Sequence, residues 1–76
     1  MLEYRVKAHR IDAHGSEAST KSATLTLDTD LNGRPDAFNP AELFLASIAA
    51  CMIKGIERVS PMIHFSLRHV DIILHG

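Results

Sequence analysis

Residues 39–60 constrain the fold of this chain most, because they form an almost uninterrupted apolar stretch that carries helix signals at both ends. Asn39 is a good N-cap, Pro40 suits the first helical position, and Glu42 stands where a capping box places an acid. At the other end a serine precedes Pro61, and the residue before a proline avoids the helical conformation. The sequence therefore predicts one helix over residues 39–60.

Apolar side chains occupy most of the circumference of this predicted helix. They are Leu43, Phe44, Leu45, Ile48, Ala49, Ala50, Met52, Ile53 and Ile56. A helix that is apolar nearly all round belongs in a core or in an interface. Two or three strands of a 76-residue chain offer too little cover for it. We therefore expect the chain to self-associate or to belong to something longer.

The segment before the helix alternates in the manner of half-buried strands. In residues 2–9 apolar residues take the even positions, and charged residues or histidine take the odd ones. Residues 14–16 indicate a turn, and residues 23–27 alternate again, with apolar residues separated by threonines. These two strands predict an antiparallel hairpin, followed by a loop over residues 28–38 that is rich in Asp, Asn, Gly and Pro.

After Pro61, residues 62–75 predict one long strand. Ile63, Phe65 and Leu67 take odd positions, whereas Val70, Ile72 and Leu74 take even ones. A shift of one residue exchanges the two faces of a strand, so a bulge or bend is expected near residues 68–69. The order strand, strand, helix, strand predicts an α+β fold with a mainly antiparallel sheet, and the 76 residues form a single domain.

Composition excludes several classes of protein. The net charge is −1 and the basic residues are scattered singly, so neither nucleic acid nor an anionic membrane surface is an expected partner. The apolar run from Leu43 to Ile53 is too short to span a bilayer, and Glu3, Arg5 and Lys7 interrupt any signal peptide. A single cysteine cannot form an intrachain disulfide, which fits a reducing compartment. We expect a cytoplasmic protein.

Cys51, the only cysteine, is the first candidate for chemistry. A free cysteine is usually a small buried hydrophobe, whereas a reactive one needs a nearby cation, base or helix N-terminus. Lys54 is the nearest cation in sequence. Glu42 is the obvious carboxylate partner, but nine residues of helix place it on the opposite face and roughly 13.5 Å away along the axis. It therefore cannot touch the cysteine of its own chain, and helix capping is its alternative role.

A calcium loop is a second candidate. Residues 28–36 match the opening of an EF-hand loop, with oxygen ligands at positions one, three and five, glycine at six and an acid at nine. Position twelve, however, is Asn39 where a glutamate is expected, and the residues before the loop indicate a strand where an EF-hand has a helix. Such loops are also ordinary turn chemistry.

The five histidines give little indication of a metal site. His9 and His14 are five residues apart, and so are His64 and His69, so the members of each pair point to opposite faces of a strand. The pattern indicates ordinary surface histidines and no bound metal. No Ser-His-Asp spacing, glycine-rich phosphate loop or aromatic-and-basic surface is present either.

The helix motif resembles the superfamily of osmotically inducible protein C and organic hydroperoxide resistance proteins (OsmC/Ohr). The matching residues are Asn39-Pro40-Ala41-Glu42-Leu43-Phe44 and then Ala49-Ala50-Cys51-Met52. In that family a loop leads into a similar motif, and a long central helix carries the peroxidatic cysteine after a pair of small residues. The resemblance extends over the whole chain as the N-terminal half of the family fold and is most specific over residues 39–52.

This resemblance implies an α+β subunit that intertwines with a second copy, so that the central helices are buried between sheets from both chains of a homodimer. For the peroxidase branch it implies thiol-dependent reduction of organic hydroperoxides without a cofactor, with Cys51 as the peroxidatic residue. The family uses a glutamate and an arginine beside the thiolate. Here Ala41 directly follows the proline and Glu42 comes one residue later, and Arg10 is the arginine that the first hairpin offers. The family's resolving cysteine belongs to its second half.

Three hypotheses follow. The first is a thiol peroxidase in which Cys51, supported by Glu42, reduces hydroperoxides and an external thiol or a second Cys51 completes the cycle. The second is a non-catalytic OsmC-like dimer that binds a small apolar ligand and in which the cysteine is structural. The third is calcium binding at residues 28–36.

Overall fold

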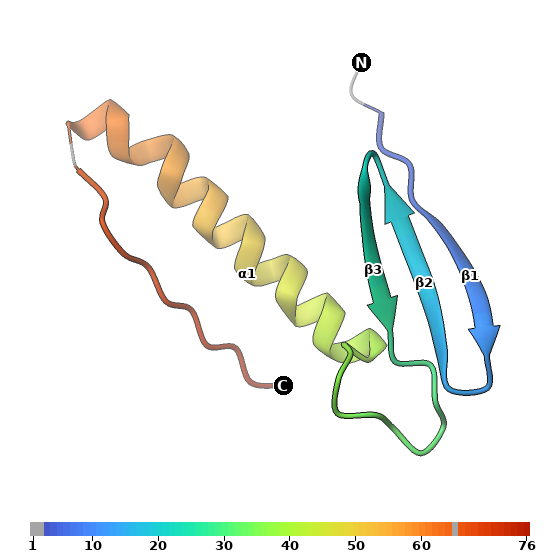
Figure 1. Ribbon diagram of the computed structural model, residues 1–76. Helices are drawn as coiled ribbons and strands as arrows, with labels where there is room; N and C mark the ends of the chain where they lie inside the picture. The colour runs from blue at the N-terminus through green and yellow to red at the C-terminus, as the bar shows by residue number, and fades with distance from the viewer. Residues whose placement is uncertain (1–2, 65) are drawn as a thin grey trace. The chain divides into compact units, whose positions relative to one another are not determined.

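The computed structural model describes residues 3–64 and 66–76, which divide into two compact units (Figure 1). The first unit ends at Ala41 and holds a three-stranded sheet with the loop that follows it. The second begins at Glu42 and holds nearly all of one long helix together with residues 66–76. The predicted α+β class is confirmed.

The sheet is antiparallel, with its strands in the order in which they occur along the chain. β1 spans Lys7–Asp12, β2 spans Gly15–Thr20 and β3 spans Ala23–Leu27. Two tight turns join them, so β2 is the central strand and bonds to both neighbours. β1 and β3 are the edges of this sheet.

The pairing register separates the two faces of the sheet by polarity. Ala8 pairs with Ala18, which pairs with Leu25, so one face carries a row of apolar side chains. The next row, on the opposite face, consists of Lys7, Ser19 and Thr24. The predicted alternation of apolar and polar positions is therefore correct in residues 23–27 and in residues 7–9 of the first strand.

The predicted hairpin between residues 2–9 and 23–27 is wrong, because β2 lies between these strands and pairs with both, so they do not pair with each other. Two of its details are wrong as well. The first strand lies at residues 7–12 instead of 2–9: the described residues before Lys7 are outside the sheet, Tyr4 and Val6 are exposed, and Leu2 lies outside the described residues. The predicted turn at residues 14–16 overlaps β2, which begins at Gly15. β2 escaped prediction because its sequence, GSEAST, has small and polar residues with no apolar alternation. Backbone hydrogen bonds to both neighbouring strands hold it in place.

The predicted helix is confirmed to within one residue at each end. α1 spans Pro40–Val59 and continues into a 3₁₀ turn, η1, over Ser60–Ile63. Pro61 is tolerated there because the first turn of a helix leaves its backbone N–H groups without helical partners. The Ser60 hydroxyl donates to the carbonyl of Ile56 at 2.8 Å. His64 ends the turn in the left-handed conformation, with φ of 56°.

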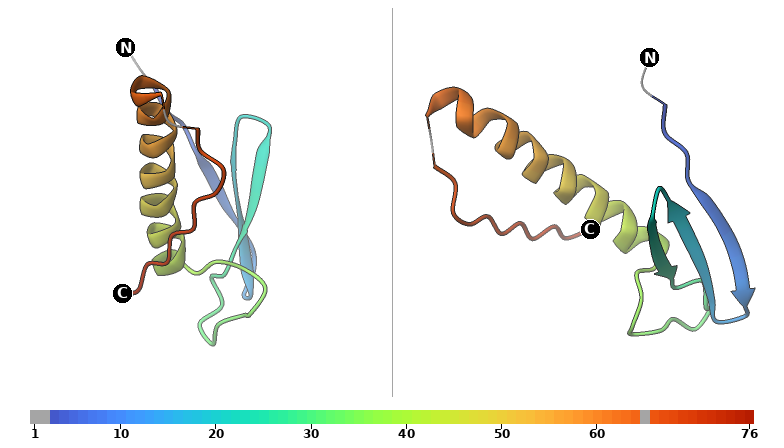
Figure 2. Two further views of the ribbon diagram at one scale, coloured as in Figure 1. Left: turned by 90° about the vertical axis from the view of Figure 1, so that its left-hand side faces the viewer. Right: turned by 45° about the horizontal axis from the view of Figure 1, so that its top comes forward.

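The expectation that this helix is buried is wrong for the single chain. No residue of α1 is buried, Cys51 is exposed, and Phe44 keeps 66% of its surface accessible. Within its own unit the helix has only residues 66–76 beside it, and these run back along it toward its N-terminal end (Figures 1 and 2). A single extended segment covers one side of a helix and leaves the rest of an all-round apolar surface in water.

The predicted strand over residues 62–75 is also wrong. Its first residues belong to η1, and residues 66–76 are extended without forming a strand. A strand needs a neighbour that supplies backbone donors and acceptors, and the described part of this unit contains no second extended segment. At the end of this segment Gly76 lies close to α1, because a Cβ atom placed on it would be 3.6 Å from Cδ2 of Leu45. The segment therefore packs against the side chains of the helix and forms no backbone hydrogen bonds of a sheet.

The predicted bulge or bend near residues 68–69 has no strand to interrupt, Ile63 belongs to η1, and Phe65 lies outside the described residues. The half-buried residues of the segment 66–76 are Leu67, Val70, Ile72 and Leu74. The step from Leu67 to Val70 is three residues, whereas the later steps are two. The same apolar pattern that favours a strand thus also serves packing against α1.

Replacing Gly55 with alanine is expected to stabilise α1. Gly55 lies inside the helix, and a Cβ atom built there meets no atom within 4 Å. Alanine loses less conformational freedom than glycine on forming a helix, so the free energy of unfolding should rise by about 0.5–1 kcal/mol. Urea unfolding followed by circular dichroism would measure the change.

Gly33→Ala is the matched control, with the opposite sign. Gly33 has φ of 81°, a conformation that costs an alanine about 1–2 kcal/mol. A loss of stability in Gly55→Ala, or a gain in Gly33→Ala, would contradict these backbone assignments.

Candidate functional site

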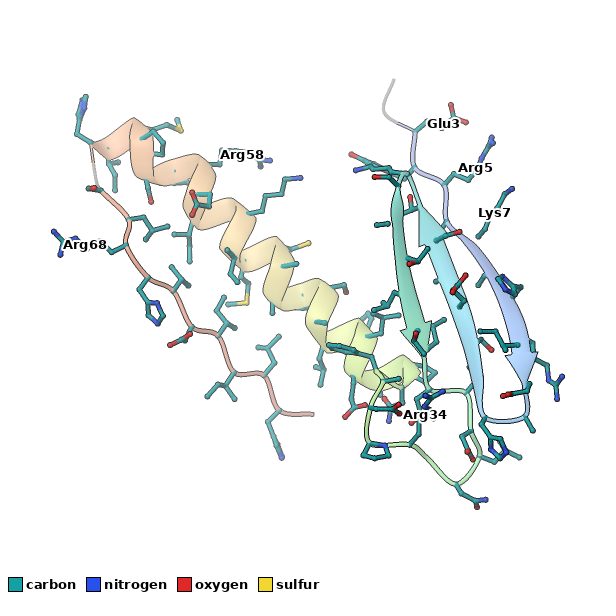
Figure 3. All side chains as sticks on the ribbon, viewed as in Figure 1. Glu3, Arg5, Lys7, Arg34, Arg58 and Arg68 are labelled. Carbon is teal, nitrogen blue, oxygen red and sulfur yellow. The ribbon has the colours of Figure 1, made fainter. Side chains whose placement is uncertain are left out.

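Cys51 lies in the middle of α1, with its side chain exposed. Because the helix is continuous from Pro40 to Val59, residues three and seven positions further on lie within about 60° and 20° of the cysteine around the axis. These residues are Lys54 and Arg58, so the thiol stands on a stripe that also carries two cations. Figure 3 marks Arg58 near the C-terminal end of the helix.

An apolar groove of about 680 Å³ lies in the second unit beside this stripe. Its lining consists of Met52, Gly55, Ile56, Val59, Ser60, Ile63 and Leu67. Cys51 is not a lining residue, but Gly55 stands one turn further along the helix and about 40° from it. The thiol therefore lies at the flank of an open, water-accessible, almost wholly hydrocarbon surface.

Within α1 the structure does not bring Glu42 to Cys51. Glu42 lies in the first turn of α1, where its charge favours the positive end of the helix dipole. The unbroken helix keeps the predicted separation from Cys51 of roughly 13.5 Å along the axis. Arg10 lies on β1 in the first unit. Sequence reasoning did not consider Arg58, which seven-residue spacing places on the same helix face as Cys51 but roughly 10.5 Å further along the axis.

The loop of the calcium hypothesis is organised by the carboxylate of Asp28, which is only 6% exposed. One of its oxygens accepts the backbone N–H of Asp30 at 3.1 Å, and the other accepts that of Arg34 at 3.0 Å. Its own N–H donates to the carbonyl of Phe38 at 2.8 Å. Asp28 thus closes the loop with its side chain and its backbone together.

A second set of contacts ties the loop to the turn between β1 and β2. The guanidinium of Arg34 donates to both carboxylate oxygens of Asp36, at 2.6 and 2.8 Å, and to the carbonyl of His14 at 3.4 Å. His14 Nδ1 donates to Asp30 at 2.7 Å. A Cβ atom on Gly15 would lie 2.6 Å from Nη1 of Arg34, so only glycine admits this close approach without a shift.

These contacts use the carboxylates that an EF-hand would offer to calcium. In residues 3–64 and 66–76 no group of three or more His, Cys, Asp or Glu side chains has a geometry that could hold a metal ion. Two histidines pair with single carboxylates instead, His14 with Asp30 and His69 with Asp71, the latter at 2.8 Å. The loop as described serves turn chemistry.

The same contacts shift the ionisation of the loop. The backbone N–H of Asn32 and the side chain of His14 hold the pKa of Asp30 below its ordinary value of 3.8. The guanidinium of Arg34 lowers the pKa of Asp36 below the same value, and Asp36 in turn raises the pKa of Arg34. Each shift favours the charged form of its residue.

Comparison with known proteins gives no relative: no family model, no curated protein and no solved structure matches this chain. None of the helices in the described ranges has the length and apolar character needed to cross a membrane.

Asp28→Asn is expected to open the loop locally. The amide keeps the shape of the side chain but turns one of the two acceptor oxygens into a donor that faces a backbone N–H. The loss should be about 1–3 kcal/mol, or roughly 5- to 150-fold in the hydrogen-exchange protection of the Asp30 and Arg34 amides. Asp71→Asn, at an exposed position in the second unit, is the control. Unchanged protection in Asp28→Asn would contradict the assigned role.

The loop should also loosen in acid. Because Asp30 and Asp36 have lowered pKa values in the folded loop, their contribution is complete above 3.8 and is lost as the pH falls through the folded values. Titrating the side-chain carboxyl carbons by NMR would give both values. In Arg34→Gln the pKa of Asp36 should return toward 3.8, whereas that of Asp30 should remain low because its largest cause is the Asn32 N–H. Equal movement of both would contradict this division.

Proposed function

We propose that this chain is an OsmC-like subunit that reduces organic hydroperoxides with Cys51 as the nucleophile. One observation carries the proposal: an exposed thiol at the flank of an apolar groove, on a helix stripe that also bears Lys54 and Arg58. The groove suits the hydrocarbon part of an organic hydroperoxide. Lys54, three residues from Cys51 on the same face of the helix, suits the negative charge that develops on the peroxide oxygen.

The chemistry balances with one external thiol equivalent at each of two steps. The Cys51 thiolate attacks the distal oxygen of the hydroperoxide, the O–O bond breaks, and the alkoxide takes a proton to leave as an alcohol. The cysteine is then a sulfenic acid. A thiol condenses with it to form a disulfide and water, and a second thiol reduces that disulfide. A reducing compartment such as the cytoplasm supplies these thiols.

We further propose that the working form is an intertwined homodimer. Its support is the apolar surface that α1 leaves in water, on which Phe44, Met52 and Val59 are all exposed. Burying apolar surface stabilises an assembly by about 25 cal/mol per Å², so a second copy that covers this helix gains in proportion to the area removed from water. Glu42 acts only across such a dimer, because the helix holds it away from Cys51 of its own chain.

A non-catalytic dimer that binds a small apolar ligand is the second candidate. The observation that favours it is the lining of the groove, which is almost entirely hydrocarbon and does not include Cys51. In this alternative the cysteine packs in the dimer and does not react.

The first proposal is tested by treating the protein with one equivalent of an organic hydroperoxide in the presence of a sulfenic-acid trap. Mass spectrometry of peptides is expected to find the trap on Cys51 and stoichiometric alcohol in solution. Oxygen added to the chain's methionines would appear equally in Cys51→Ser, so that variant separates thiol chemistry from methionine oxidation.

The double variant Ser47→Cys/Cys51→Ser is the matched control, because it moves the thiol by about one turn along the same exposed helix. It should keep the number of thiols and lose at least tenfold in the rate of peroxide reduction. Equal rates in the two proteins, or a native Cys51 that resists both peroxide and alkylation, would sink the peroxidase proposal. The second outcome, with an apolar dye bound in the groove, would favour the ligand-binding dimer.

A further inference from the structure

Three cations that are scattered in the sequence gather around one hollow of the first unit. The hollow has a volume of about 320 Å³, close to the lower end of the range for ligand pockets. It lies where β2 turns into β3, beside the segment that leads into β1. Its lining consists of Arg5, Lys7, Ser19, Thr20 and Lys21.

The sheet register explains this gathering. Lys7 and Ser19 are directly paired across β1 and β2, so their side chains share one face. Arg5 lies two residues before Lys7 and outside the strand, and Lys21 lies in the turn after β2, and both line the hollow. The hydroxyl of Thr20 donates to the carbonyl of Arg5 at 2.7 Å and holds the incoming chain against β2. Figure 3 shows Arg5 and Lys7 directed to the same side of β1.

The residues that line the hollow carry positive charge only, whereas Glu3, which extends to the same side as Arg5 and Lys7 in Figure 3, is not a lining residue. No lining residue is acidic, and within the described ranges Arg5, Lys7 and Lys21 form no ion pair. Glu17 lies on the same face of the sheet as Ser19. It pairs with His9 across β1 and β2, two residues further along the strands from the hollow than the Lys7–Ser19 pair. Three positive charges around one small volume repel each other and produce a local positive potential.

Lys21 adds an independent observation, because its backbone is strained. It occupies the two-residue turn between β2 and β3 with φ of 54°, a conformation that hairpin turns usually assign to glycine or asparagine. A long basic side chain at such a position has no local advantage for the turn. Strained residues of this kind concentrate at binding sites, where the side chain has a use.

We propose that this hollow binds a small doubly charged oxyanion, phosphate either free or as the end of a monoester. The fork of Arg5 matches two phosphate oxygens, the ammonium groups of Lys7 and Lys21 neutralise the charge, and the hydroxyl of Ser19 donates to a further oxygen. This inference goes beyond the proposed peroxide chemistry and does not depend on Cys51. It accounts together for the cluster, the absence of an acidic residue from its lining and the strained lysine.

The test is an NMR titration of the full chain with inorganic phosphate, with sodium chloride adjusted to hold the ionic strength constant. Saturable amide shifts are expected at Arg5, Lys7 and residues 19–21. A parallel titration with phenyl phosphate separates the two sources. Equal affinity assigns the site to the dianion itself, and tighter binding of the ester assigns it to a monoester.

Lys21→Gly is the most informative variant, because glycine suits the turn conformation and removes the charge. It should keep or improve the stability of the hairpin and yet weaken phosphate binding several-fold, and Arg5→Gln should do the same without relieving the turn. Arg58→Gln removes an equal charge from α1 and should leave the affinity unchanged. Non-saturable shifts, shifts that chloride reproduces, or equal affinities in Lys21→Gly and Arg58→Gln would overturn the proposal.

Discussion

The mismatch between the apolar surface of α1 and the cover available to it is the constraint on which the rest of this structure depends. The helix is apolar around most of its circumference, and its own unit provides one extended segment to pack on it. That segment buries a stripe through Leu67, Val70, Ile72 and Leu74 and leaves large side chains such as Phe44 in water. The hydrophobic effect therefore favours association through this helix. The same exposed surface carries the thiol and the groove, so self-association and substrate access are coupled in the proposed peroxidase.

The first unit is held together by different forces. Its central strand has small and polar side chains, so backbone hydrogen bonds through β2 and the contacts of one loop hold it in order. Hydrogen bonds and ion pairs between charged side chains organise the loop. The Asp28 carboxylate closes it, and contacts of His14, Asp30, Arg34 and Asp36 connect it to the turn between β1 and β2. A sequence that matches the start of a calcium loop thus achieves its closure with protein donors, because backbone N–H groups and a guanidinium satisfy the same oxygens that a cation would need.

The sequence predicted the elements whose limits depend on neighbouring residues, and it failed for elements whose structure depends on pairing with a distant segment. The ends of α1 follow from Asn39, Pro40 and Pro61, and the faces of β3 follow from alternation within five residues. β2 was missed because its polar residues extend only by pairing with strands on both sides. Residues 66–76 were assigned to a strand because their alternation is real, but a strand exists only where a neighbour completes its hydrogen bonds. For the candidate site, helical spacing correctly separated Glu42 from Cys51, and it could also have aligned Arg58 with Cys51.

The sequence by itself determined the class of the fold, the limits of the helix, the position of the thiol within it and the turn chemistry of the loop. These features depend on interactions between residues close along the chain, such as capping, helical periodicity and Asx turns. Only the tertiary structure decided that the sheet has three strands, that Cys51 is exposed, and that Arg5, Lys7 and Lys21 surround one hollow. Those outcomes depend on the pairing register of the strands and on which segments pack over the helix. Segments that are distant in the sequence decide whether a side chain meets water, a partner or another charge.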